Sequence, residues 1–134
     1  MKAFFDMITF LLRINQSVRF TLVILYVGCI VALSLLPPQA FPKLPLFAGF
    51  DKVIHFTMYF IFSMLLCWSV KTELKYMRLF LIIPVTIGWG VFMEIMQYEM
   101  HLGRSFELYD ILANSIGVIV GVIFYIIVTR KSHS

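Results

Sequence analysis

Four long apolar runs limit what this chain can fold into more than any other feature of its sequence. They cover about 20–36, 53–70, 79–98 and 111–129, and each approaches the roughly 20 residues that a helix needs to span a bilayer. The runs are continuous and lack the alternating polarity of barrel strands. Because a spanning segment must satisfy its backbone hydrogen bonds internally, the sequence predicts an all-α integral membrane protein with four transmembrane helices.

The composition agrees with this fold class and argues against a nucleic-acid-binding protein. Of the 134 residues, 61% are hydrophobic and only 13% are charged, whereas soluble domains are about one-quarter charged. The formal charge is +4, but the basic residues are scattered between apolar runs and form no basic patch. We expect a single helical unit in the membrane, with no nucleic-acid partner and no cofactor.

The first residues, 1–18, have a different pattern from the four runs. Polar residues recur every three or four positions along an otherwise apolar segment: Lys2, Asp6, Thr9, Arg13 and Gln16. This spacing predicts an amphipathic helix in the membrane interface, followed by a four-helix domain at 19–134. A cleaved signal sequence is the alternative, but no small-x-small cleavage site precedes Pro37.

The distribution of Lys and Arg predicts the orientation in the membrane. With the N-terminus inside, eight of the eleven basic residues lie on the inner side, and only Lys43, Lys52 and Arg104 lie outside. Because basic residues accumulate on the cytoplasmic side, we expect both termini in the cytoplasm of a bacterium, with the protein in its inner membrane. Most acidic residues then fall near the outer ends of the helices.

Polar side chains recur at helical spacing near these outer ends. Three predicted helices, which alternate in direction, bring them to a similar depth: Asp51, Lys52, His55 and Tyr59 on one, Glu94 and Gln97 on the next, and Asp110 and Asn114 on the last. Ionisable residues inside spanning helices are costly and normally face one another or a cavity. We therefore predict one functional cluster, which also includes Arg104 from the outer loop.

Each of these residues also has a simpler interpretation when it is taken alone. Asp51 and Asp110 can stabilise helix N-termini, and Lys52 can extend to the interface. His55 and Tyr59 can be packing residues with hydrogen bonds. Asn114 lies on a face with two glycines that permits close helix packing. The convergence of all of them favours a functional site over these separate roles.

Within the cluster, Glu94 needs the most compensation, because it lies about one turn inside its helix. Arg104 is the natural partner, and we predict that the two form a pair or share a ligand. A metal site using His55 with Asp51, Glu94 or Asp110 is an alternative, but a single histidine at this depth makes us expect none. The cysteines, Cys29 and Cys67, have no metal-type spacing and are expected to pack as small apolar residues.

Three motifs resemble the VanZ-like family of small membrane proteins. They are "DKVIHFTMYF", "MEIMQ" and "GRSFELYDILANSIGVIVG", and the resemblance covers about residues 34–124. It implies that the nine polar residues of the predicted cluster occupy the family's pattern. The family is named for an accessory protein that lowers susceptibility to teicoplanin, so the resemblance implies a role in the cell envelope.

Three classes of function fit these observations. The first is a module that binds a lipid-linked or lipopeptide envelope molecule at the outer leaflet, where Arg104 and Lys52 could pair with its anionic groups. The second is a membrane-embedded hydrolase or transferase that uses Glu94 or Asp51 beside His55 as acid or base. The third is a structural partner subunit in which the polar cluster only holds the helices in register.

Overall fold

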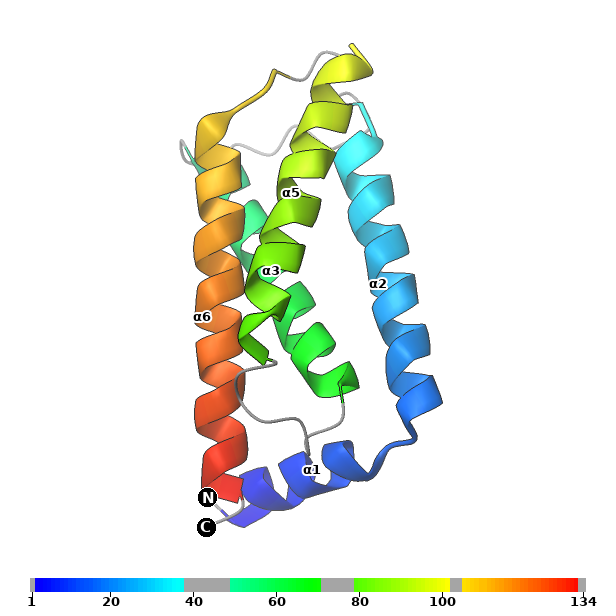
Figure 1. Cartoon of the computed structure of the whole chain (residues 1–134), viewed down its shortest axis with the longest axis vertical. Coiled ribbons are helices and arrows are strands. Elements are labelled where there is room, and N and C mark those ends of the chain that lie inside the picture. The colour runs from blue at the N-terminus through cyan, green and yellow to red at the C-terminus, as the bar shows by residue number, and fades with distance from the viewer. Residues whose placement is uncertain (1, 38–48, 71–78, 102–104, 133–134) are drawn as a thin grey trace.

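The computed structural model describes residues 2–37, 49–70, 79–101 and 105–132, and the described elements are helices. In chain order they are α1 (Lys2–Arg13), α2 (Gln16–Leu35), α3 (Phe50–Ser69), α5 (Ile82–Glu99) and α6 (Leu108–Ser132). The helices α2, α3, α5 and α6 run along the long axis of the molecule, and α1 crosses one end of it (Figure 1). The all-helical fold class is confirmed.

Within the described residues, three helices are long and apolar enough to cross a membrane: α2, α3 and the Leu108–Arg130 part of α6. Each contains one of the predicted apolar runs. The fourth run corresponds to α5, whose 18 residues include Glu94, Gln97 and Glu99 in the last two turns. These polar residues lower the hydropathy of α5, so length and composition alone identify a membrane protein with three candidate spans.

The helical conformation is interrupted at Ile14 and Asn15, between α1 and α2. This interruption lies earlier in the chain than the predicted boundary at residue 18. Asn15 caps α2, because its side-chain oxygen accepts a hydrogen bond from the Ser17 backbone N–H at 2.9 Å. The first residue of α1 and the last residue of α6 lie at the same end of the molecule (Figure 1).

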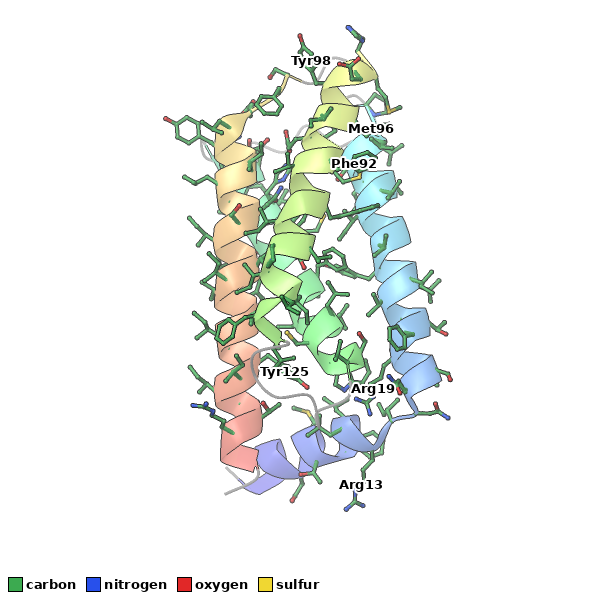
Figure 2. All side chains as sticks on the ribbon, viewed as in Figure 1. Arg13, Arg19, Phe92, Met96, Tyr98 and Tyr125 are labelled. Atoms are coloured by element: carbon green, nitrogen blue, oxygen red, sulfur yellow. The ribbon has the colours of Figure 1, made fainter. Side chains whose placement is uncertain are left out.

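Arg19 joins three helices at this end. Its guanidinium donates hydrogen bonds to the backbone oxygens of Leu12 at 3.0 Å, Ile14 at 2.9 Å and Trp68 at 2.8 Å. The charge also lies over the Trp68 ring, 5.6 Å from its centroid. Figure 2 shows Arg19 at the junction of α1 and α2. A buried arginine thus satisfies carbonyls at the C-terminal ends of α1 and α3 that would otherwise lack partners.

Among the described helices, α3 and α6 have the most extensive mutual packing, and it depends on two glycines of α6. A Cβ atom at Gly121 would lie 2.6 Å from the backbone oxygen of Phe60, and one at Gly117 would lie 3.1 Å from the backbone nitrogen of the same residue. Only glycine permits this approach of the two backbones. The predicted packing face of α6 is therefore present, and it brings the N-terminal halves of α3 and α6 into contact.

The two cysteines differ in their surroundings. Cys67 is fully buried between helices, as expected of a small apolar residue, whereas Cys29 is exposed on the surface of α2. Both lie on apolar helices, as expected, but the sequence does not reveal which face of such a helix points outward, and Cys29 lies on the outward face of α2.

Candidate functional site

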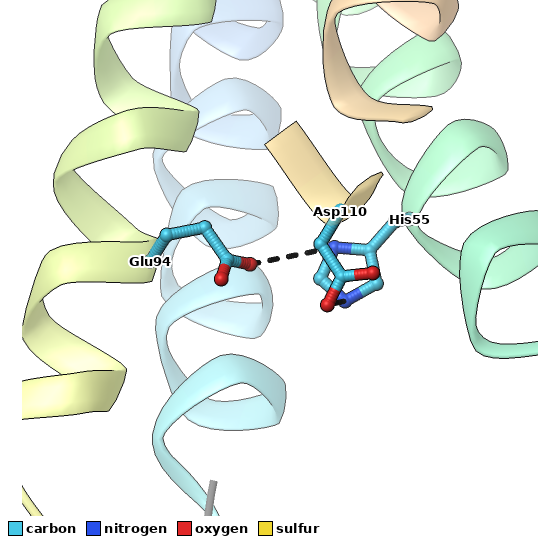
Figure 3. A group of neighbouring side chains, drawn as sticks. All are labelled: His55, Glu94 and Asp110. Atoms are coloured by element: carbon cyan, nitrogen blue, oxygen red, sulfur yellow. Dashed lines mark ion pairs between the residues drawn. The ribbon is translucent and has the colours of Figure 1, made fainter. Parts of the chain in front are cut away.

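His55 lies at the centre of a group of polar side chains from three helices. Its Nδ1 atom is 3.1 Å from the side-chain oxygen of Asn114 and 4.0 Å from a carboxylate oxygen of Glu94, and its Nε2 atom is 3.6 Å from Asp110 Oδ2. Figure 3 shows Glu94 reaching toward the imidazole, with Asp110 close to the ring. The residues come from α3, α5 and α6, so only the folded bundle assembles the group.

The hydrogen bond to Asn114 determines which way the imidazole presents its nitrogens. With the amide oxygen as acceptor, Nδ1 carries the hydrogen and donates it. A neutral His55 then turns the lone pair of Nε2 toward the carboxylate of Asp110, and a protonated His55 donates to that carboxylate instead. An imidazole held in this way between two carboxylates can accept and return a proton.

Lys52 forms a second group beside the first one, nearer the end of the bundle. Its ammonium pairs with Asp51 at 2.6 Å and also with Glu107 and Asp110. Asp110 links the two groups, because one of its oxygens faces Lys52 and the other faces His55. Its role is therefore not limited to the stabilisation of the N-terminus of α6.

Glu107 is a member of this group that the sequence analysis did not single out. It lies three residues before Asp110, so the two carboxylates share one face at the start of α6. This three-residue spacing from Asp110 is the sequence feature that could have indicated Glu107 as a member of the site. With Glu107 included, four carboxylates, Asp51, Glu94, Glu107 and Asp110, lie near one lysine and one imidazole among the described residues.

Glu94 and Tyr59 are the most deeply buried residues of the site. The Glu94 side chain is 2% exposed and the Tyr59 residue is 1% exposed. Within the described part of the chain, the Tyr59 hydroxyl has no hydrogen-bond partner. The Tyr59 ring contacts α5 where Gly90 leaves space: a Cβ at Gly90 would lie 3.1 Å from Tyr59 Cε1 and 3.4 Å from the Asn114 amide nitrogen.

Gln97 is placed differently from the rest of the predicted cluster. Its side-chain nitrogen donates a hydrogen bond of 2.7 Å to the backbone oxygen of Ser34, and both residues are buried. This contact joins α5 to α2 instead of reaching His55. Arg104 lies outside the described residues, so the predicted pair between Glu94 and Arg104 stays a prediction.

The fold and the site together define a class of protein: a small helical membrane protein whose ionisable side chains gather at one end of its bundle. Comparison with family models gives a match to VanZ/LLP1 over residues 3–129. The chain belongs to the VanZ/LLP1 family, and the match includes α1, beyond the 34–124 covered by the motifs. Comparison with curated proteins and with solved structures found no significant match.

Proposed function

We propose that α2, α3, α5 and α6 all span the cytoplasmic membrane of a bacterium, with both termini in the cytoplasm. The skew of Lys and Arg supports this orientation, as does the common end at which α1 begins and α6 ends (Figure 1). In this arrangement α1 is the predicted amphipathic helix in the inner interface. The polar cluster then lies at the outer leaflet.

The function that this geometry supports best is binding of an amphiphilic cell-envelope molecule, either lipid-linked or a lipopeptide, at the outer leaflet. The observation that carries the proposal is the convergence of charged side chains from three helices at one end of an otherwise apolar bundle. Charges in such positions are costly and typical of a functional site. Family membership adds teicoplanin, a lipoglycopeptide, as a ligand to test, together with lowered susceptibility to it.

The charges of the described residues refine the chemistry of the head group. Lys52 already pairs with three carboxylates, so it is a weaker partner for an anionic ligand than its sequence position suggested. The excess of carboxylates favours a head group that offers amine or hydroxyl donors. Amino sugars and peptide amines of envelope molecules have this chemistry.

A cavity between α2, α3 and α5 suits the hydrocarbon tail of such a molecule. Its volume is about 530 Å³, and its lining is mainly apolar: Val27, Phe62, Leu66, Val85, Thr86, Gly88, Trp89 and Phe92. Phe92, labelled in Figure 2, is two residues from Glu94, so the cavity reaches the level of the polar site along α5, although these two side chains point to nearly opposite faces of the helix. Membrane lipids would occupy the same cavity when no other ligand is bound.

Two glutamates of one helix provide a matched test of the polar site. Glu94 is buried beside His55, whereas Glu99 is exposed at the end of α5. Purified protein in lipid nanodiscs would be titrated with teicoplanin and with a glycopeptide that lacks an acyl chain. We expect Glu94→Gln to weaken teicoplanin binding at least tenfold and Glu99→Gln to leave it unchanged, with both variants folded. Equal affinities for the two variants would remove the buried carboxylate from the site.

Filling the cavity tests the tail separately from the head group. A Cβ at Gly88 would meet nothing within 4 Å, so Gly88→Leu can be accommodated and places its side chain in the cavity. We expect this variant to bind teicoplanin more weakly while the affinity for the glycopeptide without an acyl chain stays the same. A uniform loss for both ligands would contradict a tail-binding role.

A membrane-embedded hydrolase or transferase is the second candidate, and one observation favours it. His55 lies between two carboxylates with a fixed ring orientation, an arrangement that general acid–base catalysis uses. Conversion of a radiolabelled lipid-linked precursor by wild-type protein, but not by His55→Gln, would support this candidate. Unchanged precursor after prolonged incubation with wild-type protein would speak for binding alone.

A further inference from the structure

His55, Glu94 and Asp110 have the geometry of a metal-ligand set. Each residue offers one ligand atom, and these atoms lie within 4.8 Å of one another. The separation of 3.6 Å between His55 Nε2 and Asp110 Oδ2 is close to the ~3.4 Å between neighbouring ligands of a tetrahedral ion at bond lengths of about 2.1 Å. The three ligands come from α3, α5 and α6, so one ion would tie three helices together.

The hydrogen bond between His55 and Asn114 prepares the imidazole for this role. Histidines that bind metals generally donate their other ring N–H to an oxygen acceptor, which fixes the ring and its tautomer. Asn114 accepts from Nδ1 at 3.1 Å, which leaves the lone pair of Nε2 facing Asp110. A lone pair that faces a carboxylate is unfavourable unless a proton or a metal ion lies between them.

The charge balance of the described residues also favours a cation. Four carboxylates lie near His55 and Lys52, and the Lys52 ammonium already pairs with Asp51, Glu107 and Asp110. A divalent ion between His55, Glu94 and Asp110 would lie beside two carboxylates whose side chains are only 2% and 12% exposed.

The Tyr59 hydroxyl is an independent indication of a ligand. It is buried and has no hydrogen-bond partner among the described residues. A buried hydroxyl without a partner is costly. Tyr59 follows His55 by one turn on α3 and shares the space at Gly90 with Asn114, so it can donate to a water or ligand atom bound to the ion.

We propose that His55, Glu94 and Asp110 bind one divalent first-row transition-metal ion, with Asn114 orienting the histidine. One imidazole with two carboxylates suits Zn²⁺ or Mn²⁺ better than Mg²⁺ or Ca²⁺, which prefer oxygen ligands alone. Three protein ligands leave a coordination position for water or for a donor atom of a ligand. This proposal departs from the expectation, based on a single histidine, that the chain binds no metal.

The test measures metal content in the absence of any lipid or glycopeptide ligand, so its outcome is separate from that of the binding function proposed above. Full-length protein without a polyhistidine tag would be stripped with EDTA, incubated with Zn²⁺ or Mn²⁺, passed through a desalting column and measured by plasma mass spectrometry. We expect one ion per chain. We expect at least tenfold weaker binding in His55→Gln, Glu94→Gln and Asp110→Asn.

Matched controls are available at the same end of the molecule. His101 and Glu99 are exposed, so His101→Gln and Glu99→Gln should keep the ion. A wild-type protein that binds no ion after this treatment would overturn the proposal. Retention of the ion by both His55→Gln and Glu94→Gln would overturn it as well, because the ion would then lie elsewhere.

A gain-of-signal variant covers the case in which a ligand variant fails to fold. His55→Cys places a thiolate where the imidazole lies, and a thiolate bound to Co²⁺ gives an intense near-ultraviolet charge-transfer band. We expect this band in Co²⁺-loaded His55→Cys and not in the wild type, although the wild type also has Cys29 and Cys67. A folded His55→Cys protein without the band would exclude position 55 from the coordination sphere.

Discussion

Substituting Gly121 by alanine tests whether close packing of α3 and α6 holds the site together. The new Cβ would lie 2.6 Å from the Phe60 backbone oxygen, about 0.8 Å short of the 3.4 Å at which ordinary contact begins, and nearer still to the Ser63 hydroxyl. The hydroxyl can rotate away, but the backbone oxygen can move only with its helix. Relief of the clash therefore requires α6 to move away from α3.

The expected cost follows from two opposing effects. Overpacking a well-packed interface costs about 1–3 kcal/mol, and a clash with backbone belongs at the upper end of that range. Alanine is a better helix former than glycine by about 1 kcal/mol, which offsets part of this cost. We expect Gly121→Ala to lower the free energy of unfolding by about 2 kcal/mol.

Gly28 provides the control, because it lies within α2 on an exposed face and a Cβ there would meet nothing within 4 Å. Gly28→Ala should be neutral or stabilising by up to about 1 kcal/mol. Both variants would be unfolded by SDS titration in mixed micelles and followed by tryptophan fluorescence. If Gly121→Ala were as stable as wild type, α3 and α6 would not be in close contact, and the assembly of His55 with Asn114 would lose its physical basis.

Two further pairs of variants test other parts of the structure by the same unfolding assay. Arg19→Lys should lower the free energy of unfolding by about 2 kcal/mol, because one ammonium cannot reach three separate carbonyls. The control is Arg13→Lys at an exposed position, which should have no effect. Equal stability of the two variants would show that the guanidinium contacts contribute little. Tyr26→Phe should cost about 1 kcal/mol, because the Tyr26 hydroxyl donates to Met58 O at 2.9 Å. Tyr59→Phe should cost no stability, because its hydroxyl has no partner in the described structure, and a large loss would mean that it has one.

Much of the fold could be predicted from local properties of the sequence. A continuous apolar run forms a helix in a membrane regardless of its neighbours, so the four runs coincide with α2, α3, α5 and α6 to within a few residues. Helical spacing likewise places Asp51, His55 and Tyr59 on one face of α3 before any tertiary contact is known. The match to the VanZ/LLP1 family confirms the relation that the motifs indicated.

The partners within the site were decided only by tertiary structure. Sequence spacing does not reveal how far each helix is rotated about its axis or how it is shifted along its neighbour. These quantities depend on side-chain volumes at contacts such as Gly117 and Gly121, and they bring His55 to Asn114 while turning Gln97 toward Ser34. Glu107 joined the site for the same reason, because the ammonium of Lys52 lies within reach of it only after α3 and α6 have packed.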